Sequence, residues 1–146
     1  MADVPKTISI EFAGYYREPN IGGLPASAGV YCVYACTFDA QAQTVDLKRL
    51  IYIGESENIK ERVANHNLWA AWRRQLTTGQ VICVSAGGVS PEQTRHRAEA
   101  AMIFKHKPPV NEEYKHSFPF DTTTMSLSGR TNLLTPSFTV KKDATD

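Results

Sequence analysis

The stretch GVYCVYACTFDAQAQTVDLKRLIYIG, residues 29 to 54, carries the clearest secondary-structure pattern in this chain. Residues 29 to 37 are rich in valine, tyrosine and cysteine, and residues 47 to 54 form a second apolar run. The segment between them, residues 38 to 46, is polar and typical of a turn. This pattern predicts an antiparallel hairpin with a rather long loop, which would be the nucleus of a sheet.

Two helices and one more strand are predicted after this hairpin. Ser56 can cap a helix that runs to about His66, with Glu57 in its first turn, where the helix dipole favours negative charge. Apolar residues at helical spacing between 68 and 76 predict a second helix, whose two tryptophans are more typical of a core than of a base-stacking surface. Residues 81 to 85 then predict a third strand.

The strongest helix start is Ser90-Pro91-Glu92-Gln93, because serine can cap, proline suits the first helical position and glutamine can complete a capping box. This helix is expected to run to about His106, since the two prolines at 108 and 109 stop it. Residues 122 to 131 and 133 to 140 have some strand character, and residues 141 to 146 are expected to fray.

Length and composition favour one globular domain. A chain of 146 residues with 42% hydrophobic and 21% charged side chains falls in the ordinary range for a single soluble domain. No apolar run approaches the length needed to cross a bilayer, and residues 1 to 10 lack the long apolar region of a secretory signal. We therefore expect a cytoplasmic protein without a membrane partner.

The net charge of +1 hides an uneven distribution along the chain. Residues 1 to 47 carry two basic and five acidic side chains, residues 48 to 107 carry ten and five, and residues 108 to 146 carry four and five. The three segments therefore differ in net charge, at −3, +5 and −1. The basic middle segment suits an anionic partner such as a phosphate backbone, and it suits an ordinary solvated face equally well.

The three cysteines, Cys32, Cys36 and Cys83, form no CxxC pair and leave an odd thiol. This pattern argues against a disulfide framework and against a zinc cluster. Reduced cysteines packed in the core are therefore expected, and a nucleophilic role is disfavoured.

Two of the predicted helices carry charged groups where apolar ones are expected. On the first, Arg62 and His66 lie beside the apolar stripe of Ile59 and Val63, and on the longest helix Glu99 falls among apolar neighbours. A carboxylate in such a position costs free energy unless it is paired or binds a cation. Helical spacing alone therefore favours a structural ion pair between Arg62 and Glu99 ahead of a catalytic role.

Residues 29 to 31, Gly-Val-Tyr, and residues 52 to 54, Tyr-Ile-Gly, resemble the paired motifs of the GIY-YIG nuclease superfamily. The resemblance is strengthened by the order of further matching residues, which are Ser56, Asn58, Arg62, His66, Glu99 and Asn111. It spans about residues 29 to 111, and it departs from the family pattern in Val30 and in the long stretch between Tyr31 and Tyr52.

The resemblance implies an α+β fold with a small central antiparallel three-stranded sheet flanked by helices. Residues 1 to 146 would form one nuclease domain, with a core at about 29 to 111. Residues 1 to 28 would be an N-terminal arm, and residues 112 to 146 a partly strand-like C-terminal extension.

The resemblance also implies a metal-dependent endonuclease that hydrolyses phosphodiester bonds of DNA, with Mg²⁺ as its cofactor and Mn²⁺ as a substitute. Glu99 would be the metal ligand, and Arg62 would hold the scissile phosphate in its planar fork. Tyr31 would act as general base or would position the attacking water. A phenol with a free pKa of about 10 needs nearby positive charge to act as a base near neutrality.

Tyr52 and His66 would position groups or relay protons, and Asn111 would hold the site together by hydrogen bonds. Substrate contacts are expected from a set of polar and basic residues, namely Ser56, Asn58, Lys60, Arg95, Lys105 and Lys107. Double-stranded DNA is the favoured partner. Its specificity would come from the loop 38 to 46, from the tail that begins at Lys115 or from a homodimer, or it would be modest. The alternatives are a catalytically inactive module that binds nucleic acid or a protein partner, and a chance match in which Arg62 and Glu99 lie far apart.

Overall fold

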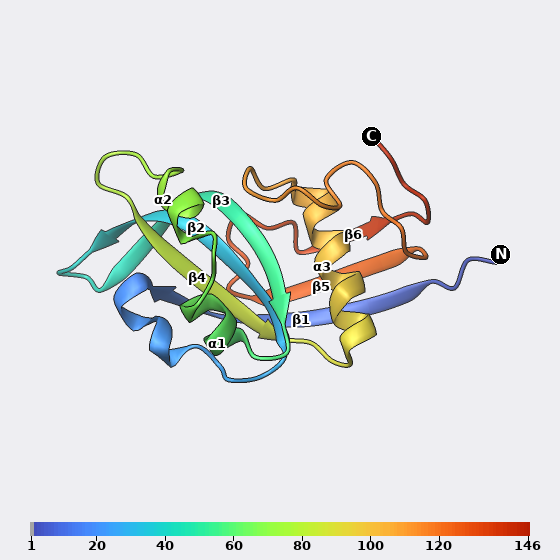
Figure 1. The fold of residues 1–146 in the computed structure, drawn as a ribbon, viewed down its shortest axis with the longest axis horizontal. Coiled ribbons are helices and arrows are strands. Elements are labelled where there is room, and N and C mark those ends of the chain that lie inside the picture. The colour runs from blue at the N-terminus through green and yellow to red at the C-terminus, as the bar shows by residue number, and fades with distance from the viewer. Residues whose placement is uncertain (1) are drawn as a thin grey trace.

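One six-stranded mixed sheet dominates the computed structural model, which describes residues 2 to 146 (Figure 1). The strand order is β3-β2-β4-β1-β5-β6, and neighbouring strands run antiparallel except β1 and β5, which are parallel. The strands are β1 (Lys6–Arg17), β2 (Gly29–Asp39), β3 (Thr44–Ser56), β4 (Val81–Gly88), β5 (Thr123–Gly129) and β6 (Ser137–Val140).

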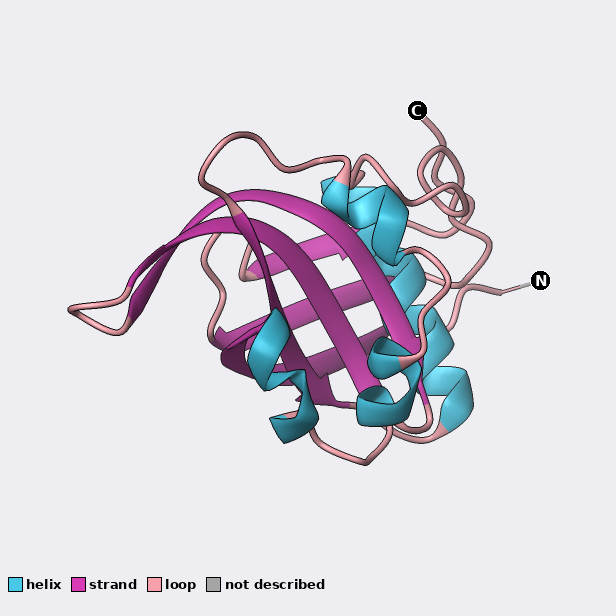
Figure 2. Ribbon diagram, turned by 60° about the vertical axis from the view of Figure 1, so that its left-hand side comes forward, coloured by secondary structure: helices cyan, strands magenta, loops and turns pink. Residues whose placement is uncertain are grey.

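Four helical segments cover the two faces of this sheet. They are the 3-10 helix η1 (Glu18–Gly23) and the α-helices α1 (Ile59–Ala64), α2 (Trp69–Arg73) and α3 (Glu92–His106). The long helix α3 packs against β3 at one edge of the sheet and against β6 at the other. The sheet must therefore curl around α3, and Figure 2 shows this bending of the strands.

Successive side chains of a strand point to opposite sides of the sheet. Since the first eight residues of β2 are all buried, this strand is buried on both of its faces. Val30, Cys32 and Tyr34 belong to the core that includes α3. Tyr31 and Val33 belong to the second core, under α1 and α2. The candidate site residues on β2 and β3 therefore lie on the side of the two short helices.

The prediction of a small three-stranded antiparallel sheet flanked by helices is wrong. The three expected strands are present as β2, β3 and β4, but the sheet continues through β1, β5 and β6 and contains a parallel pair. Residues 6 to 17, expected to lie in an N-terminal arm, form β1 between β4 and β5. Its alternation of buried Ile8, Ile10 and Phe12 with exposed residues is a strand signal, but its partner β5 lies more than a hundred residues away in the chain.

The β2–β3 hairpin has a shorter loop than predicted. Strand pairing continues out to Asp39 and Thr44, so residues 40 to 43 alone form the turn. The Asp39 carboxylate accepts hydrogen bonds from the backbone N–H groups of Gln41 at 3.0 Å and Ala42 at 3.1 Å. These bonds give the backbone N–H groups of the turn their hydrogen-bond partners. The residues on either side of the turn, which were expected to belong to the loop, instead pair with each other and extend the two strands.

The helix ends differ from the prediction in their capping residues. Asn58, rather than Ser56, caps α1 by accepting from the N–H of Glu61 at 3.1 Å, and α1 ends at Ala64, short of His66. No side chain caps α3, so the predicted capping role of Ser90 is also wrong. The end of α3 at His106 is confirmed, with the next residue in the left-handed conformation that stops a helix.

Cys36 and Cys83 form a disulfide between β2 and β4, which corrects the expectation that both are reduced. Their Cα atoms are 6.4 Å apart although 47 residues separate them in the chain. Spacing along the sequence does not reveal that β2 and β4 are neighbours. Cys32 is a free, buried thiol, as predicted.

The two strands predicted near the C-terminus are present as β5 and β6, but the fraying predicted after residue 140 is not observed. Thr145 forms a β-bridge with Ser117, and the carboxylate of Asp146 contacts Lys107 Nζ at 3.0 Å and His116 Nδ1 at 3.1 Å. Among residues 2 to 146, no helix is both long and apolar enough to cross a membrane.

Candidate active site

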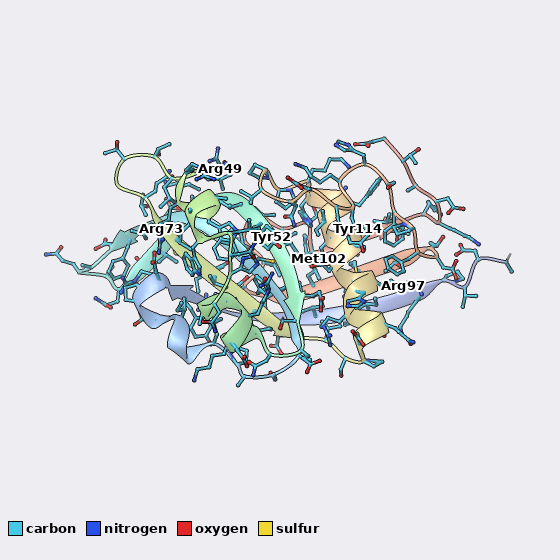
Figure 3. All side chains as sticks on the ribbon, in the orientation of Figure 1. Arg49, Tyr52, Arg73, Arg97, Met102 and Tyr114 are labelled. Atoms are coloured by element: carbon cyan, nitrogen blue, oxygen red, sulfur yellow. A yellow bond between two sulfur atoms is a disulfide. The ribbon has the colours of Figure 1, made fainter. Side chains whose placement is uncertain are left out.

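Tyr31 and Tyr52 meet on the side of the sheet covered by α1 and α2. Their ring centroids are 6.3 Å apart, and Tyr31 pairs in register with Gly54 on β3. A Cβ atom at Gly54 would collide with the hydroxyl and ring of Tyr31. The Tyr31 side chain of the first motif therefore packs directly against the backbone of Gly54 in the second motif. Figure 3 labels Tyr52, which in that view lies between α2 and α3.

His66 packs against both tyrosines just after α1. Its ring centroid is 5.4 Å from that of Tyr52, 6.3 Å from that of Tyr31 and 4.5 Å from that of Trp72. Burial, with a smaller effect of Arg62, lowers the pKa of His66 from 6.5 to about 4, so the imidazole is neutral near pH 7.

The hydrogen bonds of His66 define which of its nitrogens carries the proton. Its Nδ1 accepts from the N–H of Leu68 at 3.0 Å, which places the proton of the neutral ring on Nε2. Nε2 is buried and has no hydrogen-bond partner within residues 2 to 146. The ring therefore offers one unused N–H donor beside the tyrosine pair.

Arg62 brings positive charge to the same place from the last turn of α1. The side chain is exposed, and its charge acts on Tyr31, Tyr52 and His66. Burial raises the pKa of Tyr31, and the neighbouring Tyr52 raises it further, while the charge and hydrogen bond of Arg62 lower it. Burial has the larger effect, so Tyr31 is a neutral phenol that can orient a water molecule more readily than it can take a proton.

Glu99 approaches the tyrosines from α3. Burial raises the pKa of its carboxyl to about 8, and the negative charges of Glu55 and Glu113 act in the same direction. The charge of Glu99 in turn raises the pKa values of Tyr31 and Tyr52. The predicted Arg62–Glu99 ion pair is not among the salt bridges of residues 2 to 146; instead the two groups act on the same tyrosines.

A pocket of about 330 Å³ opens beside Glu99, with Tyr52, Asn111 and Glu113 among the residues that line it. A half-buried carboxylate with acidic neighbours is the kind of group that a divalent cation stabilises. No cluster of three or more His, Cys, Asp or Glu side chains that could hold a metal occurs in the described part of the chain. Glu99 would therefore be the single protein carboxylate available to an ion such as Mg²⁺, which can keep most of its waters.

Asn111 ties the segment after α3 to the edge strand β3. Its Oδ1 accepts from the N–H of Ile53, and its Nδ2 donates to the carbonyl of Ile53, both at 2.9 Å. The N–H of Val110 donates to the carbonyl of Ile51 at 3.1 Å. These bonds hold the residues after α3 against the strand that carries Tyr52.

Two of the expected substrate-binding residues, Ser56 and Asn58, lie near Arg62. Ser56, Asn58 and Arg62 line a second pocket, of about 410 Å³, at the start of α1. The Oγ of Ser56 accepts from the N–H of Asn58 at 3.0 Å, so both side chains also shape the turn into the helix. Lys60 is exposed on the same helix and does not line this pocket.

The other three expected substrate contacts are not brought to this position. Arg95 is only 5% exposed and is paired with Glu55, so its guanidinium orients that carboxylate. Lys105 is exposed near the end of α3, on the turn that follows the one after Glu99 and not beside that carboxyl. Lys107 contacts Asp146 at 3.0 Å and the ring of Phe104 at 4.1 Å, which ties it to the C-terminus.

Two carboxylates that help to raise the pKa of Glu99, those of Glu55 and Glu113, were not among the site residues predicted from the sequence. Glu55 follows Gly54 directly, and its carboxylate contacts Arg95 and, at 3.3 Å, Nε2 of His96. Glu113 lies two residues after Asn111 and lines the pocket beside Glu99. Both glutamates lie within two residues of an expected site residue along the chain, and this closeness was the sequence signal that could have identified them.

No protein-family model matches this sequence, and comparisons with curated proteins and with solved structures give no match either.

Proposed function

We propose that this chain is a metal-dependent endonuclease of the GIY-YIG type that hydrolyses phosphodiester bonds in DNA. The observation that carries the proposal is the meeting of Tyr31, Tyr52, His66, Arg62 and Glu99, which come from separate elements of the chain. Phosphodiester hydrolysis needs a positioned water, charge stabilisation on the phosphoryl oxygens and help for the leaving oxygen. Residues suited to each of these tasks are present together.

In this proposal Arg62 binds the scissile phosphate, because its exposed guanidinium offers several donors in one plane. The Tyr31 hydroxyl orients the attacking water, and the Nε2–H of His66 supplies a donor beside the tyrosines. Glu99 would hold Mg²⁺ or Mn²⁺, which when bound supplies positive charge to the phosphoryl oxygens and the leaving oxygen. Asn111 acts as a positioning residue through β3.

In the same proposal the substrate is double-stranded DNA and the protein acts in the cytoplasm. A homodimer would present two such sites to the two strands of a duplex. The Cys36–Cys83 disulfide runs against a strongly reducing compartment. Counting the free thiols of protein freshly isolated from its cells tests the location. One free thiol would argue against a reducing cytoplasm, and three free thiols would agree with it.

A cleavage assay tests the proposal directly. Supercoiled plasmid DNA is incubated with the wild-type protein and Mg²⁺ or Mn²⁺, and in parallel with Glu99→Gln and Arg62→Ala. We expect nicking by the wild type and a loss of about 100-fold or more in each variant, since each removes charge stabilisation of the transition state. Full wild-type rates in both variants would rule out the assigned roles.

Two matched controls separate these effects from a general loss of charge. Glu92→Gln makes the same change at an exposed position on the same helix, and Arg74→Ala removes an exposed arginine at the end of α2. Both should cleave as the wild type does. The competing hypothesis is a module that binds nucleic acid without turnover, and salt-dependent DNA binding with no cleavage under any divalent metal would favour it.

A further inference from the structure

A third pocket, of about 380 Å³ and lined mostly by polar residues, lies away from the candidate active site. It is built where the end of β1, the tip of the β2–β3 hairpin and the loop after β5 come together. Figure 1 shows the hairpin tip and the end of β1 on the same side of the molecule, opposite both termini. A pocket of this volume falls in the range of small-ligand sites.

Two arginines line this pocket. The guanidinium carbon of Arg17 lies 3.6 Å from the centre of the Phe38 ring, the distance of a stacked contact. Stacking uses the face of the guanidinium and leaves its in-plane N–H groups available. Arg130 is anchored to β1, since its backbone N–H donates to the Phe12 carbonyl at 2.9 Å and its Nε donates to the Gly14 carbonyl at 3.2 Å.

Among residues 2 to 146, no carboxylate forms a salt bridge with either of these two arginines. None of the ten residues that line the pocket is acidic. The nearest acidic residues along the chain have other partners. Glu18 pairs with Arg73, Asp39 accepts from the hairpin turn, and Asp46 pairs with Lys48 at 2.6 Å.

The remaining polar groups of the pocket are neutral. Asn20, Thr44 and Asn132 add side chains that can donate hydrogen bonds to an oxyanion. Two planar guanidiniums with neutral donors around them match the tetrahedral oxygens of a phosphate, which arginine binds through paired N–H groups. The aromatic ring of Phe38 adds an apolar wall for a planar group attached to that phosphate.

We propose that this pocket binds a phosphate group carried by a nucleotide or by a nucleic-acid strand. Binding here does not require the nuclease activity, because the pocket shares no lining residue with the pockets beside Arg62 and Glu99. The site would therefore persist in a protein that cleaves nothing.

A ligand titration followed by ¹H–¹⁵N NMR tests this inference in buffer without divalent metals. The probes are thymidine, thymidine monophosphate, and an oligothymidylate without terminal phosphates. We expect thymidine monophosphate, but not thymidine, to shift backbone amides at residues 14 to 17, 43 to 45 and 130 to 132. A response to the oligothymidylate as well would identify backbone phosphates as ligands, and its absence would identify a terminal phosphate.

Arginine variants provide the decisive comparison. Arg17→Gln and Arg130→Gln should each weaken thymidine monophosphate binding by about tenfold or more, because each removes charge-assisted hydrogen bonds. Arg74→Gln, an equal loss of charge outside the pocket, should bind as the wild type does. Arg17→Gln tests the site even if Arg130→Gln disturbs the contact with Gly14. Equal shifts with thymidine, or equal affinity in the Arg17→Gln and Arg74→Gln proteins, would overturn the inference.

Discussion

At the scale of the residue, the two motifs depend on each other through one contact. Tyr31 is 1% exposed, and its hydroxyl and ring occupy the space where a side chain at Gly54 would be. Position 54 of β3 must therefore lack a Cβ atom. Only then can the Tyr31 side chain take the orientation that brings it close to Tyr52, Arg62 and Glu99.

Gly54→Ala should displace Tyr31 and lower the free energy of unfolding by about 1 to 3 kcal/mol, because the added methyl group overpacks a buried site. Cleavage activity should fall with it. Gly88→Ala is the matched control, since its Cβ would meet no atom closer than the Ala28 carbonyl oxygen at 3.9 Å. Urea unfolding and plasmid nicking measure both effects. A Gly54→Ala protein as stable and as active as Gly88→Ala would contradict the packing argument.

The electrostatics of Glu99 and His66 affect stability in opposite pH ranges. Glu99, with its pKa raised from 4.5 to about 8, keeps a proton in the folded state that the unfolded chain has released, so stability falls as pH rises through this range. His66, with its pKa lowered from 6.5 to about 4, makes stability fall as pH drops below 6.5. Of the two groups, Glu99 alone therefore acts between pH 6.5 and pH 8.

Without divalent metal, the wild-type protein should lose about 1 to 2 kcal/mol of unfolding free energy between these two pH values, given a limit of about 1.4 kcal/mol per pH unit. Glu99→Gln should remove this loss, and Glu92→Gln should keep it. Urea denaturation at both pH values measures the difference. The same pH slope in Glu99→Gln as in the wild type would show that burial of this carboxyl is not its source.

At the scale of the element, β2 is the strand on which the site depends, because β3 and β4 pair with it on either side. Its pairing with β4 is covalently reinforced by the Cys36–Cys83 disulfide, and its pairing with β3 brings Tyr31 to Tyr52. The exposed edge of β3 is in turn covered by the hydrogen bonds of Val110 and Asn111. The tyrosines therefore lie on strands fixed at both sides.

Replacing both bonded cysteines, Cys36→Ala with Cys83→Ala, should lower the free energy of unfolding by about 2 to 4 kcal/mol, since the bond closes a loop in the unfolded chain. Adding a reductant should lower the stability of the wild type to the same extent and leave the double variant unchanged. A thiol titration of the denatured, unreduced protein should find only Cys32. Three reactive thiols would contradict the disulfide.

At the scale of the whole molecule, both ends of the chain complete the sheet that carries the site. β1 lies between β4 and β5, and the buried side chains of β1, β5 and β6 share one core with α3. The position of Glu99 opposite the tyrosines therefore depends on residues far outside the stretch that resembles the nuclease family.

A fragment of residues 29 to 111 should consequently fail to fold cooperatively, because it lacks three of the six strands and exposes the core face of α3. Thermal and urea unfolding followed by circular dichroism would show this as the absence of a transition. A chain that begins at residue 5 loses only exposed contacts and should unfold cooperatively. A sharp transition in the shorter fragment would mean that β2, β3, β4 and α3 are self-sufficient.

The sequence by itself determined the local features of this protein. The positions of β2, β3, β4 and α3 and the end of α3 at His106 follow from short-range patterns, and so does the burial of His66 and, in part, of Glu99. The inward orientation predicted for Arg62 is wrong, since its side chain is exposed. Such patterns depend on neighbours within a few residues, as periodicity and capping do. They predict which side chains face the interior without showing what those side chains meet.

Only the tertiary structure decided which distant segments lie together. It placed β1 in the middle of the sheet, joined Cys36 to Cys83, paired Arg95 with Glu55 and gathered the two arginines of the phosphate pocket. Each of these contacts joins residues separated by at least 40 positions, and none has a signal within a short window of sequence. Burial and charge, which set the pKa values of Glu99 and His66, arise from the same long-range packing.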